Sequence, residues 1–368
     1  MLNSRHVRFR DLAVTDPEVR RELTDTFARM LDHGMFIEGP ELAGFETEFA
    51  AYTGVNHAVG VGSGTSALYL ALAASGIGPG DEVITTPMSW IATLNAIHAV
   101  GATPVFVDIG ADLNIDPALI EDSITEQTAA ILPVHFNGRM CAMDRIMEIA
   151  RRRGVKVIED AAQVAGAALP SGRAGSFGTA GAFSLNPMKV MTGYGESGAV
   201  TTNDPEIRDR VVSMRYLGTI DKETCVRPEL NHKMDALHAA FLRVSLTHLD
   251  KIVARRRDCA RHYNDRLQGL VGCPDIPNDE SCVFFDYTIT TPSRAALMEH
   301  LLENGVEVKI KHRLLMPDNP AYAHLGKVDV PRAREMVAQI LCLPIHEKLT
   351  ADDIDYVCDR IEAFFDPS

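Results

Sequence analysis

Apolar residues recur along the chain with two different periods. Near the N-terminus, residues 17–33 and 40–52 repeat apolar positions roughly every three to four residues, as amphipathic helices do. Beyond them, short apolar runs alternate with helix-like segments. The predicted strands cover residues 83–85, 104–107, 129–133 and 155–158, and the helices between them cover residues 90–100, 117–123 and 143–153. This alternation predicts an α/β fold, with a mostly parallel sheet flanked by helices on both faces.

The second half of the chain predicts a smaller unit. A long helical pattern over residues 234–267, with a break expected inside it, leads into further short elements. These are strands at residues 283–289 and 306–310 and helices at residues 293–304 and 351–364. We therefore expect a large domain over residues 1–250 and a small C-terminal α/β domain over residues 251–368.

Composition narrows the function classes. The 368 residues carry a net charge of −14, which disfavours nucleic acid as a partner because that role needs a basic face. No apolar run reaches about 18 residues, so no membrane partner is expected. The 7 cysteines are scattered without a C-x-x-C pair, which fits a reducing cytoplasm. The 13 histidines are dispersed and form no H-E-x-x-H motif, so no metal site is predicted.

A glycine-rich turn at Gly60–Gly64 precedes an apolar helix that begins near Thr65. Free N–H groups at a helix start favour a phosphate, and the hydroxyls of Thr65 and Ser66 could add donors. The stretch Gly62–Ala67 also mimics the dinucleotide-binding pattern. However, no clean first strand precedes it and no acidic residue ends a second strand, which weakens an NAD-binding alternative. A plain turn with a helix cap remains open.

Two polar residues follow the apolar run at residues 155–158. Asp160 stands at the expected carboxyl edge of the sheet, where ligands of parallel sheets bind, and Gln163 could reach the same pocket. A carboxylate there can hold a protonated heterocyclic nitrogen. A helix cap or a metal ligand is the alternative for Asp160.

Lys189 follows Asp160 by 29 residues, between an apolar run and the glycine-rich turn at Gly193–Gly198. A lysine held in a pocket can lose its proton and attack an aldehyde, although most lysines lie on the surface. Trp90, the one tryptophan, follows a predicted strand and could stack on a flat ring. Core packing is the alternative for Trp90.

In combination, these motifs resemble those of one known family. From about Phe36 to Asp355 the chain resembles the pyridoxal 5'-phosphate (PLP)-dependent sugar aminotransferases of the DegT–StrS class, which have the aspartate-aminotransferase fold (fold type I). The motifs that carry the resemblance are Gly39–Leu42, Gly64–Leu68, Gly76–Ile84, Pro133–His135, Glu159–Gln163, and Phe183–Ser184 with Lys189. Each motif alone is weak, and together they are specific.

The resemblance implies a role for each matching residue. Lys189 would form the Schiff base with PLP, Asp160 would pair with the pyridine nitrogen, and Gln163 would lie beside the phenolic oxygen. Trp90 would stack on the ring. The residues implied to contact the cofactor phosphate are Gly64, Thr65, Ser66, Ser184 and, reaching across from a neighbouring subunit, Asn231. The resemblance therefore implies a homodimer with shared active sites.

The implied reaction moves an amino group, with glutamate as the expected donor, through the pyridoxamine phosphate form of the cofactor to a keto-sugar. That sugar would be nucleotide-linked or acidic, in surface-polysaccharide or natural-product sugar biosynthesis. Some relatives are sugar dehydratases in which histidine replaces the lysine, and Lys189 argues against that alternative. A non-catalytic regulatory protein on the same fold is the other alternative, which the complete lysine, aspartate and glutamine set disfavours.

Two segments depart from the family pattern. Ser197 replaces a glycine in the usual G-E-G-G, and Lys311-His312-Arg313 stands where the family often has I-H-Y-P, near the substrate entrance. On a strand, Lys309, Lys311 and Arg313 would share one face, with His312 opposite. Such a face could bind an acidic sugar or a nucleotide diphosphate. The alternative is a solvated edge strand whose lysines block aggregation.

Overall fold

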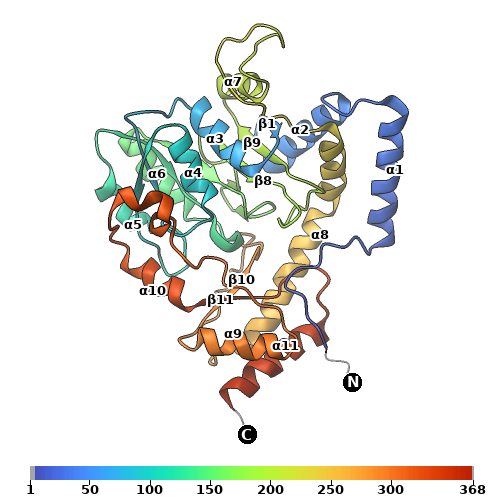
Figure 1. Cartoon of the computed structure of the whole chain (residues 1–368), viewed down its shortest axis with the longest axis vertical. Coiled ribbons are helices and arrows are strands. Elements are labelled where there is room, and N and C mark those ends of the chain that lie inside the picture. The colour runs from blue at the N-terminus through green and yellow to red at the C-terminus, as the bar shows by residue number, and fades with distance from the viewer. Residues whose placement is uncertain (1–4, 367–368) are drawn as a thin grey trace.

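A computed structural model describes residues 5–366, and its centre is a sheet of seven strands (Figure 1). In spatial order these are β1 (His57–Val61), β9 (Gly198–Thr202), β8 (Ala180–Ser184), β5 (Lys156–Asp160), β4 (Thr128–Leu132), β2 (Glu82–Thr85) and β3 (Thr103–Phe106). From β8 to β3 all neighbours are parallel, and β9 runs antiparallel to both of its neighbours. The mostly parallel α/β sheet predicted from the sequence is confirmed.

Helices cover both faces of this sheet. They are α2 (Pro40–Thr53), α3 (Gly64–Ala74), α4 (Ala92–Ala99), α5 (Pro117–Ile120), α6 (Met143–Arg153) and α7 (Pro205–Arg215). Because side chains alternate along a strand, Ile131 and Val157 pack in one core with Phe45, while Ile158 packs in the opposite core with Leu70. The sheet is thus buried on both faces, as the continuous apolar runs of its parallel strands require.

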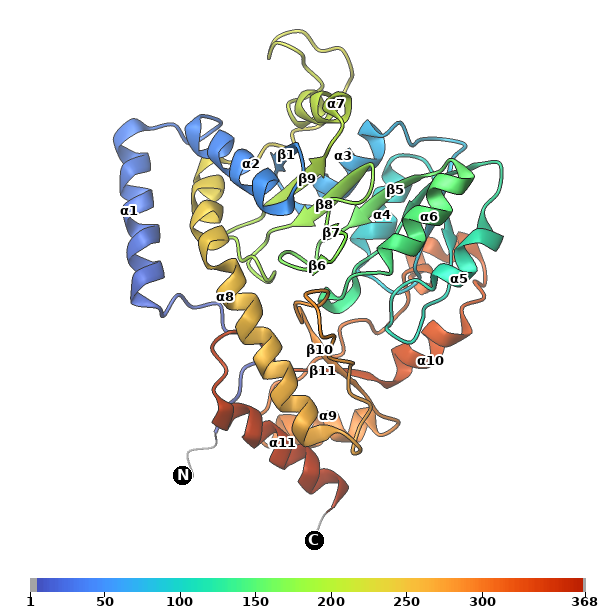
Figure 2. The same cartoon turned by 180° about the vertical axis from the view of Figure 1, so that it is seen from behind.

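Capping residues set the bounds of the first helix. In α1 (Pro17–His33), Asp16 accepts hydrogen bonds from the backbone of Glu18 and Val19, and Gly34 ends the helix with φ of 69°. A cap before a proline and a glycine after the last turn are the usual signals of a helix, and the predicted helix at residues 17–33 is confirmed. Figure 2 shows α1 standing at the side of the molecule, next to α8.

The C-terminal part of the chain forms a smaller unit below the sheet (Figure 2). Strands β10 (Tyr287–Thr290) and β11 (Ile340–Leu343) pair antiparallel, and the helices are α9 (Arg294–Glu303), α10 (Pro331–Gln339) and α11 (Ala351–Phe365). The long helix α8 (Ala236–Leu267) contacts both α2 and α11, so it joins the two parts. The predicted domain boundary at residues 250/251 falls inside α8 and stays a prediction.

Four sequence expectations were wrong. The strand predicted at residues 283–289 is limited to β10, which begins only at Tyr287. Helix α8 is unbroken, because its 32 residues contain neither proline nor glycine. Strand β1 does precede the glycine-rich turn, although it was not recognised there. Residues 306–310 form no strand. Val306 bridges to Val7 and Lys309 bridges to Cys342, so the segment pairs with two different partners and forms no continuous ladder with either.

Residues 5–366 contain no helix that is both long and apolar enough to cross a membrane. The same residues contain no cluster of three or more histidine, cysteine or acidic side chains arranged to hold a metal ion.

Candidate active site

A cavity of about 610 Å³ lies at the carboxyl edge of the parallel strands. The large domain contributes Gly64, Thr65, Leu68, Ser89, Trp90, Ala92, Thr93, Asp160, Ala162, Gln163, Ser184, Asn186, Met188, Lys189 and Glu196. The small unit contributes Phe285, Lys309, Lys311 and His312. Most residues that the sequence singled out therefore meet in one place, although they come from segments far apart along the chain.

Asp160 ends β5 with its side chain fully buried. Thr93 donates its hydroxyl hydrogen to the carboxyl group at 2.7 Å, and the backbone N–H of Ala162 donates at 3.2 Å. Burial raises the pKa of Asp160, and these hydrogen bonds together with the charge of Lys189 only partly oppose it. The negative charge of Asp160 would therefore be stabilised by a cationic group bound in the cavity.

The neighbouring Glu159 fixes the end of β5. Its carboxylate accepts hydrogen bonds from the backbone N–H groups of Gly175 and Phe177 at 2.9 and 2.8 Å. It also lies 3.2 Å from Nε2 of the buried His135. Because the N–H of Cys141 donates to Nδ1 of His135 at 3.0 Å, the ring proton sits on Nε2 and points to Glu159. His135 therefore supports the strand rather than facing a ligand.

Lys189 lies in a tight turn that follows β8. Its own N–H donates to the carbonyl of Asn186 at 3.0 Å, and the hydroxyl of Thr192 donates to its carbonyl at 3.0 Å. The Nζ atom lies 4.7 Å from the centre of the Phe285 ring. Burial lowers the pKa of Lys189 to about 8; Asp160 opposes this shift, and Lys311 adds to it. The neutral, nucleophilic form of the amine therefore predominates only above about pH 8, but it is far more populated near neutral pH than in an ordinary lysine.

The glycine-rich turn brings the start of α3 against the end of β8. A Cβ atom on Gly64 would lie 2.4 Å from Cβ of Ser184, so only glycine fits there. The N–H groups in the first turn of a helix have no acceptor within the helix, and here Gly64 and Thr65 line the cavity. Ser66 does not line the cavity, and its hydroxyl lies 3.0 Å from both the Ser63 hydroxyl and Nδ1 of His232.

The remaining candidate residues occupy different positions. Gln163 accepts a hydrogen bond from the Asn137 backbone at 2.9 Å, which leaves its amide NH₂ group for the cavity. Trp90 lies at the rim and is 64% exposed, so it is not part of a core. Asn231 and Arg313 are both exposed, and neither lines the cavity. Of the cationic segment at residues 311–313, only Lys311 and His312 reach it.

Several cavity residues were not identified from the sequence. Thr93 had a usable signal, because it lies one helical turn after Trp90 in a segment predicted as helix. Phe285 had no such signal, since the small unit presents it from a distant part of the chain.

Ser197, which replaces the usual glycine of the family, does not line the cavity. It is fully buried and donates to the carbonyl of Leu185 at 2.9 Å, which ties the two ends of the lysine turn together.

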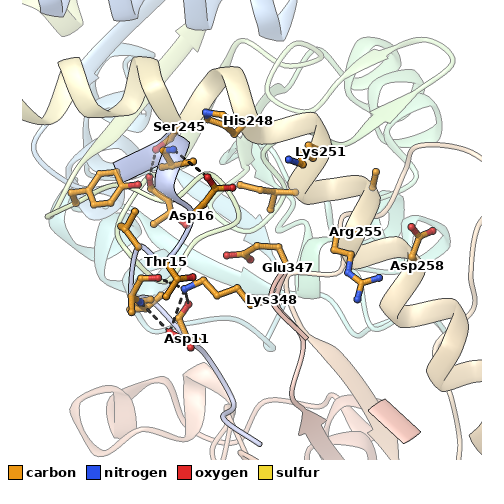
Figure 3. Close-up of a pocket in the computed structure, with 18 residues that line it drawn as sticks. Asp11, Thr15, Asp16, Ser245, His248, Lys251, Arg255, Asp258, Glu347 and Lys348 are labelled. Carbon is orange, nitrogen blue, oxygen red and sulfur yellow. Dashed lines mark hydrogen bonds and ion pairs between the residues drawn. The ribbon is translucent and has the colours of Figure 1, made fainter. Parts of the chain in front are cut away.

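A second cavity, of about 700 Å³, lies between the N-terminal segment and α8 (Figure 3). Acidic residues such as Asp16 and Glu347 and basic residues such as Lys251 and Arg255 line it together, as do Thr192 and Tyr194 from behind the lysine turn. Neither Lys189 nor Asp160 lines this second cavity. The carboxyl-edge cavity is therefore the candidate active site, although it is the smaller of the two.

Known proteins that are similar to this chain include sugar transaminases. The chain is 40% identical over 360 residues to the dTDP-3-amino-3,4,6-trideoxy-alpha-D-glucose transaminase of Streptomyces venezuelae, covering 96% of this chain and 95% of that protein. The crystal structure of S. venezuelae DesV in complex with a ketimine intermediate superimposes with a TM-score of 0.94 at 40% identity, covering 98% of each chain.

Another similar protein has a cofactor in its structure. NtdA from Bacillus subtilis, solved with bound PMP, superimposes with a TM-score of 0.92 at 28% identity, covering 98% of this chain and 85% of that one. Residues 17–362 match the sequence profile of an aminotransferase family across nearly the whole chain. This protein is therefore a member of the DegT/DnrJ/EryC1/StrS aminotransferase family.

Proposed function

We propose that this protein is a PLP-dependent sugar aminotransferase. It would move an amino group from glutamate to a keto-sugar, linked to a nucleotide or itself acidic, in the biosynthesis of surface polysaccharides or natural-product sugars. The observation that carries the proposal is the pairing, in one cavity, of Lys189, whose pKa is lowered to about 8, with the buried Asp160. The similar S. venezuelae protein, named as a transaminase of a dTDP-linked sugar, supports the substrate class.

The cavity residues fit PLP, which has an aldehyde, a phosphate and a basic ring nitrogen. Burial raises the pKa of Asp160 and its direct hydrogen-bond partners are neutral, so a protonated ring nitrogen would stabilise its charge. The close approach of Gly64 to Ser184 brings the first turn of α3 next to the Ser184 hydroxyl at the cavity, where a phosphate would find N–H and O–H donors. When bound, PLP supplies an electron-withdrawing ring for the substrate carbon.

Lys189 would have two tasks. As a neutral amine it would condense with the cofactor aldehyde, with the carbonyl oxygen leaving as water. After the amino donor displaces it, the freed amine would move a proton between the donor's α-carbon and the cofactor. The ring of Phe285 lies next to the reacting amine, with its centre 4.7 Å from Nζ of Lys189. Asp160 would keep the ring nitrogen protonated throughout, with Thr93 orienting its carboxylate.

Other residues would hold the cofactor in place. Thr65 and Ser184 would bind its phosphate, Gln163 would donate from its free amide group to the phenolic oxygen, and Trp90 would cover the ring from the rim. We do not assign Ser66 a direct phosphate contact, because Ser66 does not line the cavity.

We further propose a homodimer in which Asn231 completes the neighbour's site. The loop that follows α7 projects from the body of the molecule (Figure 1). Asn231 lies at the base of this loop, where it bridges to Tyr216, and is exposed outside its own chain's cavity. A residue in this position is free to reach a second subunit.

We also propose that the protein functions in the cytoplasm. All 7 cysteines are free thiols, which agrees with a reducing compartment.

The direct test combines the purified protein with PLP, glutamate and then a nucleotide-linked keto-sugar, with the absorbance recorded after each addition. We expect a band at about 400–430 nm, its loss with glutamate and its return with the keto-sugar. An aminated sugar should be detected by mass spectrometry. If glutamate left the band unchanged, or if the keto-sugar failed to restore it, the proposed donor or acceptor would be wrong.

A further inference from the structure

Lys311 is an unusual lysine, because its charged end lies inside the active-site cavity. Its side chain is 20% exposed, and Nζ forms an ion pair of 2.5 Å with Asp286. The same nitrogen lies 4.1 Å from the centre of the Phe285 ring. Lys189 lies 4.7 Å from that ring centre, so both lysine nitrogens are close to the reacting end of the cavity.

Asp286 cannot neutralise this lysine alone, because it has a second cationic partner. Arg10, from the N-terminal segment, lies 2.8 Å from the other oxygen of the Asp286 carboxylate. Both side chains of that pair are buried, at 5% and 0% exposure. Burial by itself would raise the pKa of Asp286, but the charges of Lys311 and Arg10 outweigh it and lower that pKa. Burial lowers the pKa of Lys311, and the charge of Asp286 opposes that shift. With Lys311 protonated, the Arg10–Asp286–Lys311 cluster carries two positive charges and one negative charge.

The N-terminal segment that supplies Arg10 is firmly held. The Arg10 guanidinium donates to the carbonyls of Phe285 and, at 3.3 Å, Ile345. The next residue, Asp11, is held by Lys348. The Lys348 amine donates to the carbonyl of Asp11 at 3.0 Å and lies 3.3 Å from its carboxylate, as Figure 3 shows. Arg10 is thus a fixed part of the cluster.

The other charged residues of the cavity do not remove the surplus charge, because Lys309 adds one cation and Glu196 one anion. Burial lowers the pKa of His312 to about 4, so this side chain adds no charge at neutral pH. Asp160 also lies in the cavity, but it is the partner proposed for the cofactor nitrogen. A buried positive charge without an equal negative charge is unfavourable, and an anion that enters with a substrate would compensate it.

The position of Lys311 distinguishes between candidate anions. The phosphates of a nucleotide-linked sugar are separated from the reacting carbon by the sugar ring, whereas the α-carboxylate of an amino acid is bonded directly to that carbon. Because Lys311 and Lys189 lie over the same phenyl ring, the surplus charge is near the reacting carbon. Resting on the proposed function, we infer that Lys311 binds the α-carboxylate of the amino donor, with Asp286 and Arg10 as positioning residues.

The test measures carboxylate binding separately from turnover. Glutarate, a dicarboxylate without an amino group, is titrated calorimetrically into the PLP-loaded enzyme and into Lys311→Met. Loss of an ion pair to a carboxylate should raise the glutarate Kd about 10-fold or more. Lys311→Arg, which keeps the charge, should retain most of the affinity. Arg313→Met is the matched control, because it removes an exposed cation two residues away, and it should bind glutarate as the wild type does.

The substitution is compatible with folding, because Lys311→Met leaves Asp286 paired one-to-one with Arg10. Retention of the cofactor band in Lys311→Met verifies this. Arg10→Met should weaken glutarate less, since Arg10 does not line the cavity. In the half-reaction with glutamate, Lys311→Met should raise the donor concentration for half-saturation more than it lowers the limiting rate, and should spare the KM for the keto-sugar.

The outcomes separate this inference from the proposed function. If the wild type transfers amino groups and Lys311→Met binds glutarate equally well, the Lys311 assignment is overturned while the function stands. If Lys311→Met raises only the keto-sugar KM, the donor assignment is likewise overturned, because the lysine then serves the acceptor. If glutarate binding depends on Lys311 but no amino group is transferred, the carboxylate site is supported and the proposed function is contradicted.

Discussion

The hydroxyl of Thr93 donates a hydrogen bond of 2.7 Å to the buried carboxyl group of Asp160. The Ser89 hydroxyl lies 2.9 Å from the Thr93 oxygen. Since the Thr93 hydrogen is directed to Asp160, Ser89 must be the donor in that second contact. A short chain of hydroxyls therefore connects the start of α4 to the end of β5 and fixes the orientation of the carboxylate.

This relationship predicts the effect of Thr93→Val. Removing the hydroxyl should raise the pKa of Asp160 further, because the bond that opposes the effect of burial is lost. We expect kcat to fall about 10-fold, since an unmade hydrogen bond to a charged group costs about 1.5–3 kcal/mol. Thr85→Val is the matched control, because its buried hydroxyl bonds only to the Leu132 carbonyl. Equal kcat losses in both variants would mean that Thr93 acts through stability alone.

Asp160→Asn tests the charge itself. The amide keeps the size of the side chain but cannot hold a proton on the cofactor ring nitrogen. We expect kcat to fall by about 100-fold or more, with the fold retained, because removing a buried charge does not by itself destabilise the site. Steady-state kinetics and circular dichroism measure the two effects. A loss of less than about threefold would make Asp160 a structural cap only.

The lowered pKa of Lys189 predicts a pH dependence for cofactor capture. Below about pH 8 the amine is protonated and cannot attack the aldehyde, and above it the amine is neutral. The rate at which the apoenzyme recovers the cofactor band should therefore rise with pH and level off above about 8. Lys311→Met should move this midpoint upward, since the Lys311 charge helps to lower the pKa. A wild-type midpoint near the ordinary lysine value of about 10.4 would contradict the burial argument.

Subunit mixing tests the role of Asn231. Asn231→Ala should raise the Kd for PLP in the homodimer without changing the fold. A heterodimer of Asn231→Ala with Lys189→Ala should contain one site with both an intact Lys189 and an intact partner asparagine. We expect this mixture to recover tight PLP binding at that site and measurable turnover. If Asn231→Ala binds PLP as tightly as the wild type, or if mixing restores nothing, the shared-site proposal is wrong.

The sequence predicted the parallel strands β2, β3, β4 and β5 because each is a short apolar run next to a segment with a helical period. The parallel strand β8 (Ala180–Ser184) was not predicted, since no helix follows it. Strand β9 was missed because its residues Gly198–Thr202 are small and polar as well as apolar, and its antiparallel direction breaks the βαβ pattern. At residues 306–310 the error was the opposite one, because a strand was predicted where the structure has none. Its alternating apolar residues are buried, but the N-terminal segment and β11 each pair with only part of it.

The site was predictable where chemistry and sequence spacing coincide, as for Asp160 and Lys189. It was not predictable where tertiary contacts decide the role. Arg10 and Asp286 are 276 residues apart, yet their side chains meet in a buried ion pair. In the cationic segment, Lys311 is inside the cavity and Arg313 is exposed, although both were expected on one strand face.

The most direct test of the central claim is the replacement of Lys189 itself. Lys189→Ala should show no band at about 400–430 nm with PLP and no amino transfer, while its circular dichroism stays that of the wild type. Lys309→Ala is the matched control, since it removes another lysine that lines the same cavity, and it should keep both the band and turnover. Amino transfer by Lys189→Ala at close to the wild-type rate would contradict the assignment of Lys189 as the reacting amine.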